Sequence, residues 1–131
     1  MFAAPRGGKA SSLGRPGGTD HGARAEAIAV DYLARQGLVI VARNFRTRQG
    51  EIDIIAREGD TLVFVEVRMR SRADYGGAAG SVTSAKRERW IAASLAYLAQ
   101  LGREPPCRFD VVLLDGLDAS RVIWERDVVS T

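Results

Sequence analysis

The stretch GEIDIIAREGDTLVFVEVR, from Gly50 to Arg68, decides the fold that we expect for this chain. Two runs of strand-forming residues flank the dipeptide Gly59-Asp60, which suits a tight two-residue turn, so the stretch predicts an antiparallel β-hairpin. With the turn at this dipeptide, Asp53 lies directly opposite Glu66 on the neighbouring strand. The expected register of the hairpin therefore brings two carboxylates together.

The two faces of this hairpin differ in polarity, because successive side chains of a strand point to opposite sides of a sheet. One face is wholly apolar and is expected to join the core; it consists of Ile52, Ile54, Ala56, Val63, Val65 and Val67. The other face carries four charged side chains and continues into two apolar ones: Glu51, Asp53, Glu66 and Arg68, then Ile55 and Phe64. The charged side chains gather at the end of the hairpin that lies away from its turn.

The facing carboxylates have two possible explanations. Like charges that face each other across two strands are destabilising, and burial removes roughly several kcal/mol of hydration from each ion. A divalent cation relieves both costs, since Mg²⁺ is held by one or two carboxylates together with water. The alternative is a solvated face on which Arg68 neutralises both acids. Spacing alone leaves both interpretations open, and a register slip of one residue would separate the acids.

Hydrophobic periodicity and turn residues predict the elements outside the hairpin. Thr19 or Asp20 is expected to cap a helix that runs to Gln36 and stops at Gly37. Strands are predicted over residues 38–45, 50–58, 61–70, 107–114 and 121–129, with a glycine-rich loop over residues 71–81.

A second helix is predicted over residues 84–101. Ile91, Leu95 and Leu98 have the spacing of a stripe that faces the core, and Pro105 follows the helix and prevents its continuation. Two further expectations concern packing: Arg108 and Asp110 form a structural ion pair, while Trp90, Trp124 and Cys107 serve as packing residues.

The expected fold is an α/β domain with a mixed β-sheet, in the order helix, three-strand antiparallel meander, helix, strand, strand. The helix between the third and fourth strands implies a right-handed crossover and one parallel strand pair. The apolar run from Val111 to Leu114 is typical of a strand that is buried on both faces. A helix is therefore expected on each face of the sheet.

Glu26 is the third acidic residue of interest. Ala29, Val30 and Leu33 place it on or beside the apolar face of the first predicted helix. A carboxylate rarely points toward a core without a partner. If this helix covers the polar face of the hairpin, Glu26 reaches the two facing carboxylates. The alternative is a side chain at the edge of the apolar stripe that reaches solvent.

Composition narrows the class of protein. The 131 residues are 46% hydrophobic with a net charge of +3, which is ordinary for one globular domain and favours a polyanionic partner over a membrane. Residues 1–20 are rich in glycine and are expected to be a disordered basic tail, with a single domain over 21–131. One cysteine and one histidine rule out a zinc cage, and no apolar run approaches the roughly 20 residues of a membrane span. We expect a cytoplasmic protein.

Asp53, followed thirteen residues later by Glu66-Val67-Arg68, resembles the two-part metal site of the PD-(D/E)XK nuclease superfamily. More closely, the chain resembles the YraN-like family of uncharacterised bacterial proteins. The segments that carry this resemblance are Gly22–Glu26, Asn44–Arg46, Gly50–Asp53, Phe64–Arg68, Tyr75–Gly77, Ser81–Thr83 with Lys86, and Cys107–Val111. Several motifs thus occur in order over most of the chain.

The resemblance implies a restriction-endonuclease-like fold, similar to that of archaeal Holliday-junction resolvases. It also implies Glu26, Asp53 and Glu66 as ligands of Mg²⁺ or Mn²⁺, and DNA rather than RNA as the nucleic acid. Because a four-way junction has two-fold character, a resolvase would be expected to act as a homodimer.

One position departs from the superfamily pattern, since its usual lysine is Arg68 in this chain. A lysine can be neutral when buried and help to deprotonate the attacking water, whereas arginine stays charged. Arg68 would still stabilise negative charge in the transition state, and Lys86 is the alternative cation. Either the metal alone activates the water, or the site binds nucleic acid without cutting it.

Three basic clusters flank the acidic centre in the sequence. They are Arg43, Arg46 and Arg48; Arg68, Arg70 and Arg72; and Lys86, Arg87 and Arg89. We expect them to contact phosphates, because neutralised phosphates supply most of the affinity of proteins for DNA. The alternative is a solvated basic rim without a ligand.

The sequence therefore predicts a metal-dependent endonuclease that hydrolyses phosphodiesters of DNA, with branched or junction DNA as its candidate substrate. Asp53, Glu66 and Arg68 are the expected catalytic residues. The second hypothesis is a nucleic-acid-binding module without cleavage, and Arg68 is its best support. A protein-interaction scaffold is a third hypothesis, and it requires an exposed apolar patch.

Overall fold

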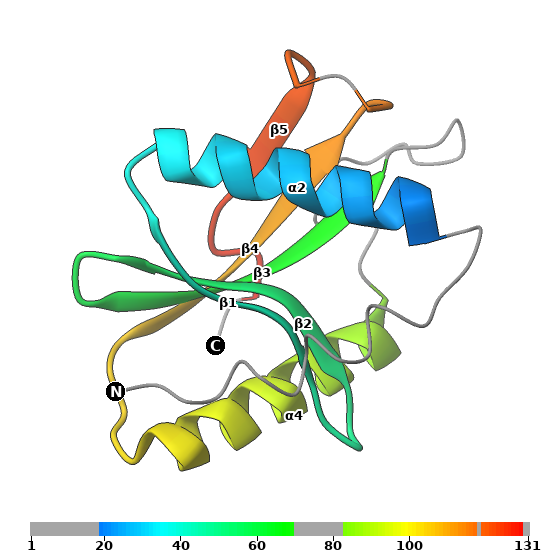
Figure 1. The fold of residues 1–131 in the computed structure, drawn as a ribbon. Helices are drawn as coiled ribbons and strands as arrows, with labels where there is room; N and C mark the ends of the chain where they lie inside the picture. Colours follow the sequence, from blue (N-terminus) through cyan, green and yellow to red (C-terminus); the bar gives the residue numbers. More distant parts are fainter. Residues whose placement is uncertain (1–18, 70–82, 118, 130–131) are drawn as a thin grey trace.

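The computed structural model describes residues 19–69, 83–117 and 119–129, which form a five-stranded sheet with a helix on each face (Figure 1). The elements are α2 (Thr19–Arg35), β1 (Val39–Arg46), β2 (Glu51–Glu58), β3 (Thr61–Met69), α4 (Ser84–Leu101), β4 (Cys107–Leu114) and β5 (Val122–Glu125). This order confirms the predicted α/β class with its helix, meander, helix and two final strands.

The sheet is mixed, as predicted. Its strands lie in the order β1-β2-β3-β4-β5. The first three strands pair antiparallel, β3 and β4 pair parallel, and β4 and β5 pair antiparallel. α4 belongs to the connection between the two parallel strands, because such strands cannot be joined by a tight turn.

The predicted register of the β2–β3 hairpin is confirmed. Ile54 pairs with Val65, and Glu58 pairs with Thr61 at the other end of the ladder. Gly59 in the turn has a φ of 61°, a left-handed conformation that glycine adopts without steric cost. The ladder continues to the residues immediately next to the two carboxylates.

Two apolar clusters, one on each face of the sheet, form the core. Ala29 and Leu33 of α2 belong to the first cluster, and Trp90 and Tyr97 of α4 belong to the second. The α2 cluster takes the strand residues Ile54, Ala56, Val63, Val65, Val112 and Leu114, and the α4 cluster takes Ala42, Phe45, Ile52, Ile55, Leu62, Phe64, Val111 and Leu113. Alternate residues of β4 enter opposite clusters, which confirms that this strand is buried on both faces.

One expectation about the hairpin faces is wrong. Ile52 packs with Ile55 in the α4 cluster and not with Ile54 in the α2 cluster. Strict alternation would place residues 52 and 54 on one face. The alternation breaks beside Asn44, which lies between the partners of Ile52 and Ile54 on β1 and has a φ of 55°. This left-handed residue interrupts the extended backbone next to Asp53.

The end of α2 is confirmed and its start differs by one or two residues. Gly37 has a φ of 99°, and the N–H of Leu38 donates to the carbonyl of Leu33 at 3.1 Å, which closes the helix in a Schellman motif. Thr19 and Asp20, expected as the cap, both lie inside the helix.

The helix α4 has the predicted limits. Thr83 caps its start, since its Oγ1 accepts a hydrogen bond from the N–H of Lys86 at 3.2 Å, and Gly102 ends it with a φ of 79°. Ile91 and Leu98 pack against the core as predicted, whereas Leu95 is 61% exposed. The buried residues of the helix are Trp90, Ala93, Ser94 and Tyr97. The two large aromatic rings, two turns apart, fill the space above the sheet and set which face of the helix is buried.

The last strand is shorter than the predicted 121–129. Asp127 has a φ of 56°, which ends the extended backbone, and the N–H of Val128 then donates to the carbonyl of Phe109 at 2.7 Å. Within the described ranges, every helix is too short or too polar to cross a membrane. Most of the predicted tail, the predicted loop over 71–81, Arg70 and Arg72 lie outside the described residues.

Candidate metal centre and nucleic-acid interface

Asp53 lies at the point where β2 and β3 stop pairing. The ladder between these strands ends at Ile54 and Val65. One residue further, Oδ2 of Asp53 accepts a hydrogen bond from the backbone N–H of Val67 at 2.8 Å. The carboxylate thus takes the place of the next backbone acceptor, which fixes it beside Glu66.

The pKa of Asp53 reflects the burial of its carboxylate and the negative charge of the neighbouring acidic side chains. Burial raises the pKa of Asp53 most, repulsion by Glu66 is the next cause, and the value reaches about 8. The hydrogen bond from Val67 lowers the pKa by a smaller amount, while Glu26 and Glu51 raise it further. The negative charge around Asp53 is therefore incompletely balanced, which is the electrostatic condition of a cation site.

This raised pKa predicts a pH dependence of folding without added metal. Because Asp53 titrates near 8 in the folded state and near 3.8 when unfolded, the folded chain holds the extra proton between these values. The contribution of this proton to the free energy of unfolding is complete at low pH and is lost as the pH rises through 8. Urea unfolding from pH 6 to pH 9 should show the free energy of unfolding falling by up to about 1.4 kcal/mol per pH unit before levelling off. The slope should vanish in Asp53→Asn; an identical slope in both proteins would contradict the assignment.

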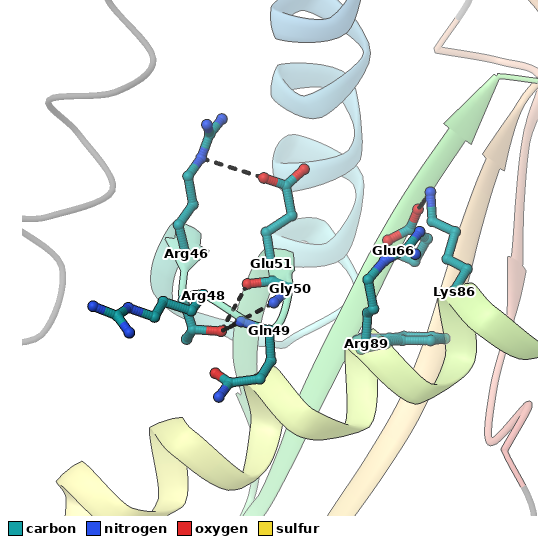
Figure 2. Close-up of a pocket in the computed structure, with 10 residues that line it drawn as sticks. Arg46, Arg48, Gln49, Gly50, Glu51, Glu66, Lys86 and Arg89 are labelled. Atoms are coloured by element: carbon teal, nitrogen blue, oxygen red, sulfur yellow. Dashed lines mark hydrogen bonds and ion pairs between the residues drawn. The ribbon is translucent and has the colours of Figure 1, made fainter.

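Glu66 is the second predicted acid, and it lies on β3 with a side chain almost wholly buried. Its Oε2 is 2.6 Å from Nζ of Lys86, which projects from the first turn of α4 (Figure 2). Thr83 caps this turn and so holds Lys86 in place beside the strand. The lysine raised as an alternative from the sequence is thus in direct contact with the acidic pair.

Glu26 is buried but has other partners. Its Oε1 accepts hydrogen bonds from Nη2 of Arg43 and from Nδ2 of Asn44, both at 3.0 Å. The condition under which Glu26 would reach the two acids, with α2 over the hairpin face of Ile55 and Phe64, is not met, because α4 covers that face. Glu26 instead reaches the site over β1, near the interruption at Asn44, and its charge still raises the pKa of Asp53.

The described residues include no group of three His, Cys, Asp or Glu side chains arranged to hold a metal ion. The structure brings Asp53 and Glu66 together and turns Oε1 of Glu26 toward Arg43 and Asn44. A two-carboxylate site remains chemically sufficient for Mg²⁺ or Mn²⁺, since Mg²⁺ keeps several waters and binds to one or two protein carboxylates. Oε2 of Glu26 accepts no hydrogen bond from another described residue.

The predicted basic residues fall into two groups. Arg43 and Arg46 are paired with acids, the latter through Nε at 3.3 Å from Oε1 of Glu51. Arg48 and Arg87 are exposed, and Arg68 is half-buried on β3. Within the described ranges these last three make no ion pair. The pairing of Arg68 with both acids, offered as an alternative explanation of the hairpin, does not occur.

A cavity of about 400 Å³ opens beside Glu66 (Figure 2). Its walls come from the β1–β2 turn, from the start of β2, from the second half of β3, and from the first two turns of α4. The lining residues are Arg46, Thr47, Arg48, Gln49, Gly50, Glu51, Glu66, Lys86, Arg89 and Trp90. Two of the three basic clusters, far apart in the sequence, thus meet at one hollow next to the acidic pair.

Sequence reasoning missed Asn44 as a residue of the site. Its amide donates to Glu26, and it has a left-handed φ on β1 opposite Asp53. Asparagine tolerates this conformation better than most residues, but its sequence position inside a predicted strand gave no sign of it. The available signal was the segment Asn44–Arg46, which carries part of the family resemblance.

A second charged network lies at the other end of the sheet and serves the fold. Asp110 is fully buried and accepts hydrogen bonds from Arg108, from Nε1 of Trp124 and from the N–H of Asp127. Nη1 of Arg108 also donates to Glu58 at 2.7 Å. This confirms the predicted ion pair and shows that Trp124 is both a packing residue and a hydrogen-bond donor.

Comparison with known proteins places these residues in a family context. The profile described as "Uncharacterised protein family UPF0102" matches residues 25–114. A UPF0102 protein of Methylobacillus flagellatus is 51% identical over 81% of this chain and 93% of its own length. One from Nitrosospira multiformis is 48% identical over 81% of this chain and 89% of its own, and one from Cupriavidus necator is 57% identical over 79% and 77%.

Proposed function

The chain belongs to the uncharacterised protein family UPF0102, and from that premise we propose that it is a metal-dependent nuclease that hydrolyses phosphodiester bonds of DNA. The observation that supports this proposal is the pair Asp53 and Glu66. Two neighbouring carboxylates, one with a pKa raised to about 8 by burial and repulsion, form a site that a divalent cation would stabilise. The order of elements in the sheet agrees with the restriction-endonuclease-like fold that the sequence resemblance implies.

The proposed roles follow from the contacts of each side chain. Asp53 and Glu66 would hold Mg²⁺ or Mn²⁺, and Glu26 would complete the site through Oε2, since only its Oε1 is bonded to Arg43 and Asn44. The bound ion would lower the pKa of a water molecule and so supply the attacking hydroxide. The Val67 N–H holds the Asp53 carboxylate in a fixed position.

Lys86 and Arg68 are the two candidates for the cation that stabilises the reacting phosphate. Lys86 is in contact with Glu66, while Arg68 makes no ion pair within the described ranges. A positive group beside the acidic pair would stabilise the charge that develops on the phosphate oxygens in the transition state. Arg43, Arg46, Arg48, Arg70, Arg72 and Arg87 would bind the flanking phosphates of the nucleic acid.

The direct test is cleavage of labelled four-way junction DNA, linear duplex DNA and RNA, each with Mg²⁺, with Mn²⁺ and with a chelator. We expect DNA products only with a metal ion, and more product from the branched substrate. A junction-cutting enzyme should also sediment as a homodimer at the concentrations used. Cleavage that continues in Asp53→Ala and in Glu66→Ala, or that needs no metal ion, would refute the assignment.

Substitution of Lys86 separates the two candidate cations. Lys86→Met should lower kcat by about 100-fold with a small change in KM, because the lost contact matters mainly in the transition state. Lys86→Arg should recover only part of this loss, since arginine restores charge but cannot give up a proton. Arg103→Met removes a charge from an exposed position beyond α4 and serves as the control. A normal kcat in Lys86→Met together with a large loss in Arg68→Met would assign the role to Arg68.

A second candidate function is nucleic-acid binding without cleavage. It is favoured by Arg68 in place of lysine and by the existing ion pair between Glu66 and Lys86. This alternative predicts salt-sensitive DNA binding with no metal-dependent product. Binding that is unaffected by charge reversal at Arg46 and Arg70 would argue against it.

A further inference from the structure

The cavity beside Glu66 has an excess of positive charge. Arg46 is paired with Glu51 across its wall, and Lys86 is paired with Glu66. Its remaining guanidinium groups, those of Arg48 and Arg89, have no acidic partner among the residues that the structure describes. The cavity therefore suits an anionic ligand. Phosphate is the anionic group of nucleic acids, and arginine binds it through paired N–H donors.

The walls of the cavity are held in place before any ligand binds. In the β1–β2 turn, the Thr47 N–H donates to the carbonyl of Gly50 at 2.8 Å, and Oγ1 of Thr47 accepts from the N–H groups of Gln49 and Gly50 at 3.1 Å. Gly50 lies so close to α4 that a Cβ atom there would be 2.5 Å from the carbonyl oxygen of Arg89. The turn and the helix thus form one preformed surface.

One buried N–H donor at this surface lacks an acceptor. Nε1 of Trp90 is buried and has no hydrogen-bond partner in the described part of the chain, whereas Nε of Arg46 lies 3.3 Å from Oε1 of Glu51 without forming a hydrogen bond. Both residues line the cavity. Buried donors are usually satisfied, so the Trp90 N–H at the cavity wall is available to an acceptor group of a ligand.

The size of the hollow limits the form in which nucleic acid can enter. A volume of about 400 Å³ is that of a pocket for one small molecule. A base that is paired and stacked in a duplex must leave the stack before a pocket of this kind can receive it. We propose that this cavity binds one unpaired nucleotide of the substrate strand, with its phosphate on Arg48 and Arg89. The inference rests on the proposed function, because Glu66 at the cavity wall is also a proposed metal ligand of the nuclease site.

The substrate class is therefore DNA with an unpaired nucleotide next to the cleaved bond, as at an opened branch point, a flap or a splayed end. The test is fluorescence anisotropy in a chelator with three labelled probes: a short single strand, its blunt duplex, and the duplex with a single-stranded overhang. The wild-type protein should bind the single strand and the overhang about tenfold or more tightly than the blunt duplex. Arg48→Ala with Arg89→Ala should lower the affinity for the single strand and for the overhang about tenfold more than the affinity for the blunt duplex.

A matched control is Arg35→Ala with Arg103→Ala, which removes the same charge from exposed positions outside the cavity. This control should keep the preference for unpaired strands. Equal binding of all three probes by the wild type, or equal loss in both double variants, would overturn the subsite. Cleavage assays with Mg²⁺ separate the two proposals. Cleavage without strand preference overturns only the subsite, whereas strand preference without any cleavage overturns only the nuclease assignment.

Discussion

Asp53→Asn is expected to lower the rate of metal-dependent cleavage by about 1000-fold, which corresponds to about 4 kcal/mol of transition-state stabilisation. The same substitution is expected to stabilise the metal-free protein at pH 8 by about 2–4 kcal/mol. Both effects have one cause. The Asp53 carboxylate is buried beside Glu66, so its negative charge is costly in the empty site and useful only when a cation binds.

The amide is chosen because it preserves local structure. Its carbonyl oxygen can still accept the hydrogen bond that Asp53 takes from the Val67 N–H, so the ends of β2 and β3 stay in place. Cleavage assays and urea unfolding should be run on the same preparation. Asp31→Asn is a suitable control, since Asp31 pairs with Arg35 on the exposed side of α2 and the substitution should change neither property.

The opposite pattern would refute this account of Asp53. If Asp53→Asn is less stable than the wild type at pH 8, the carboxylate is held by favourable contacts and is not strained by repulsion. If the variant cleaves DNA at the normal rate, Asp53 does not hold the metal ion. A stabilised and inactive variant supports both the electrostatics and the proposed role.

Asp110→Ala is expected to lower the free energy of unfolding by about 3–5 kcal/mol, the largest effect on stability that we predict. Asp110 is fully buried and accepts hydrogen bonds from Arg108, Trp124 and the backbone of Asp127. Its loss leaves the Arg108 guanidinium largely buried with only Glu58 as a partner. Hydrogen bonds to Asp110 raise the pKa of Arg108, so this group cannot escape the cost by losing its proton.

Chemical unfolding measures this loss, with Asp115→Ala as the control. Asp115 also pairs with an arginine, but its side chain is 50% exposed, and the substitution should cost less than about 1 kcal/mol. The double variant Arg108→Met with Asp110→Leu should recover much of the stability that Asp110→Ala loses, because it no longer contains a buried Arg108 charge without its partner. A loss in Asp110→Ala no larger than in Asp115→Ala would show that the network contributes little to folding.

Much of the fold follows from local features of the sequence. The turn at Gly59-Asp60 sets the register of the hairpin, and that register places Asp53 beside Glu66. The limits of α4 follow in the same way from a capping residue before the helix and Gly102 after it. These features act between residues that are close along the chain or joined by a tight turn, so backbone preferences alone determine them.

The partners of the acidic residues were decided by tertiary structure. Lys86 contacts Glu66 only because α4 packs on this face of the sheet, and Glu26 meets Arg43 only because α2 packs on the other. The cavity likewise exists because Gly50 lies against the backbone of α4 at Arg89.

Packing also overrode two simple periodic expectations. Leu95 has the spacing of a core residue but is exposed, because Trp90 and Tyr97 occupy the space over the sheet. Ile52 joins the face opposite to Ile54, and the change of face occurs at Asp53, which lies opposite the left-handed Asn44. The hydrophobic periodicity of the sequence indicates which residues of a helix or strand can be buried on the same face. Which of them are buried, and which charged side chains then meet, depends on how large side chains fill a shared volume between layers, and this is a property of the folded chain as a whole.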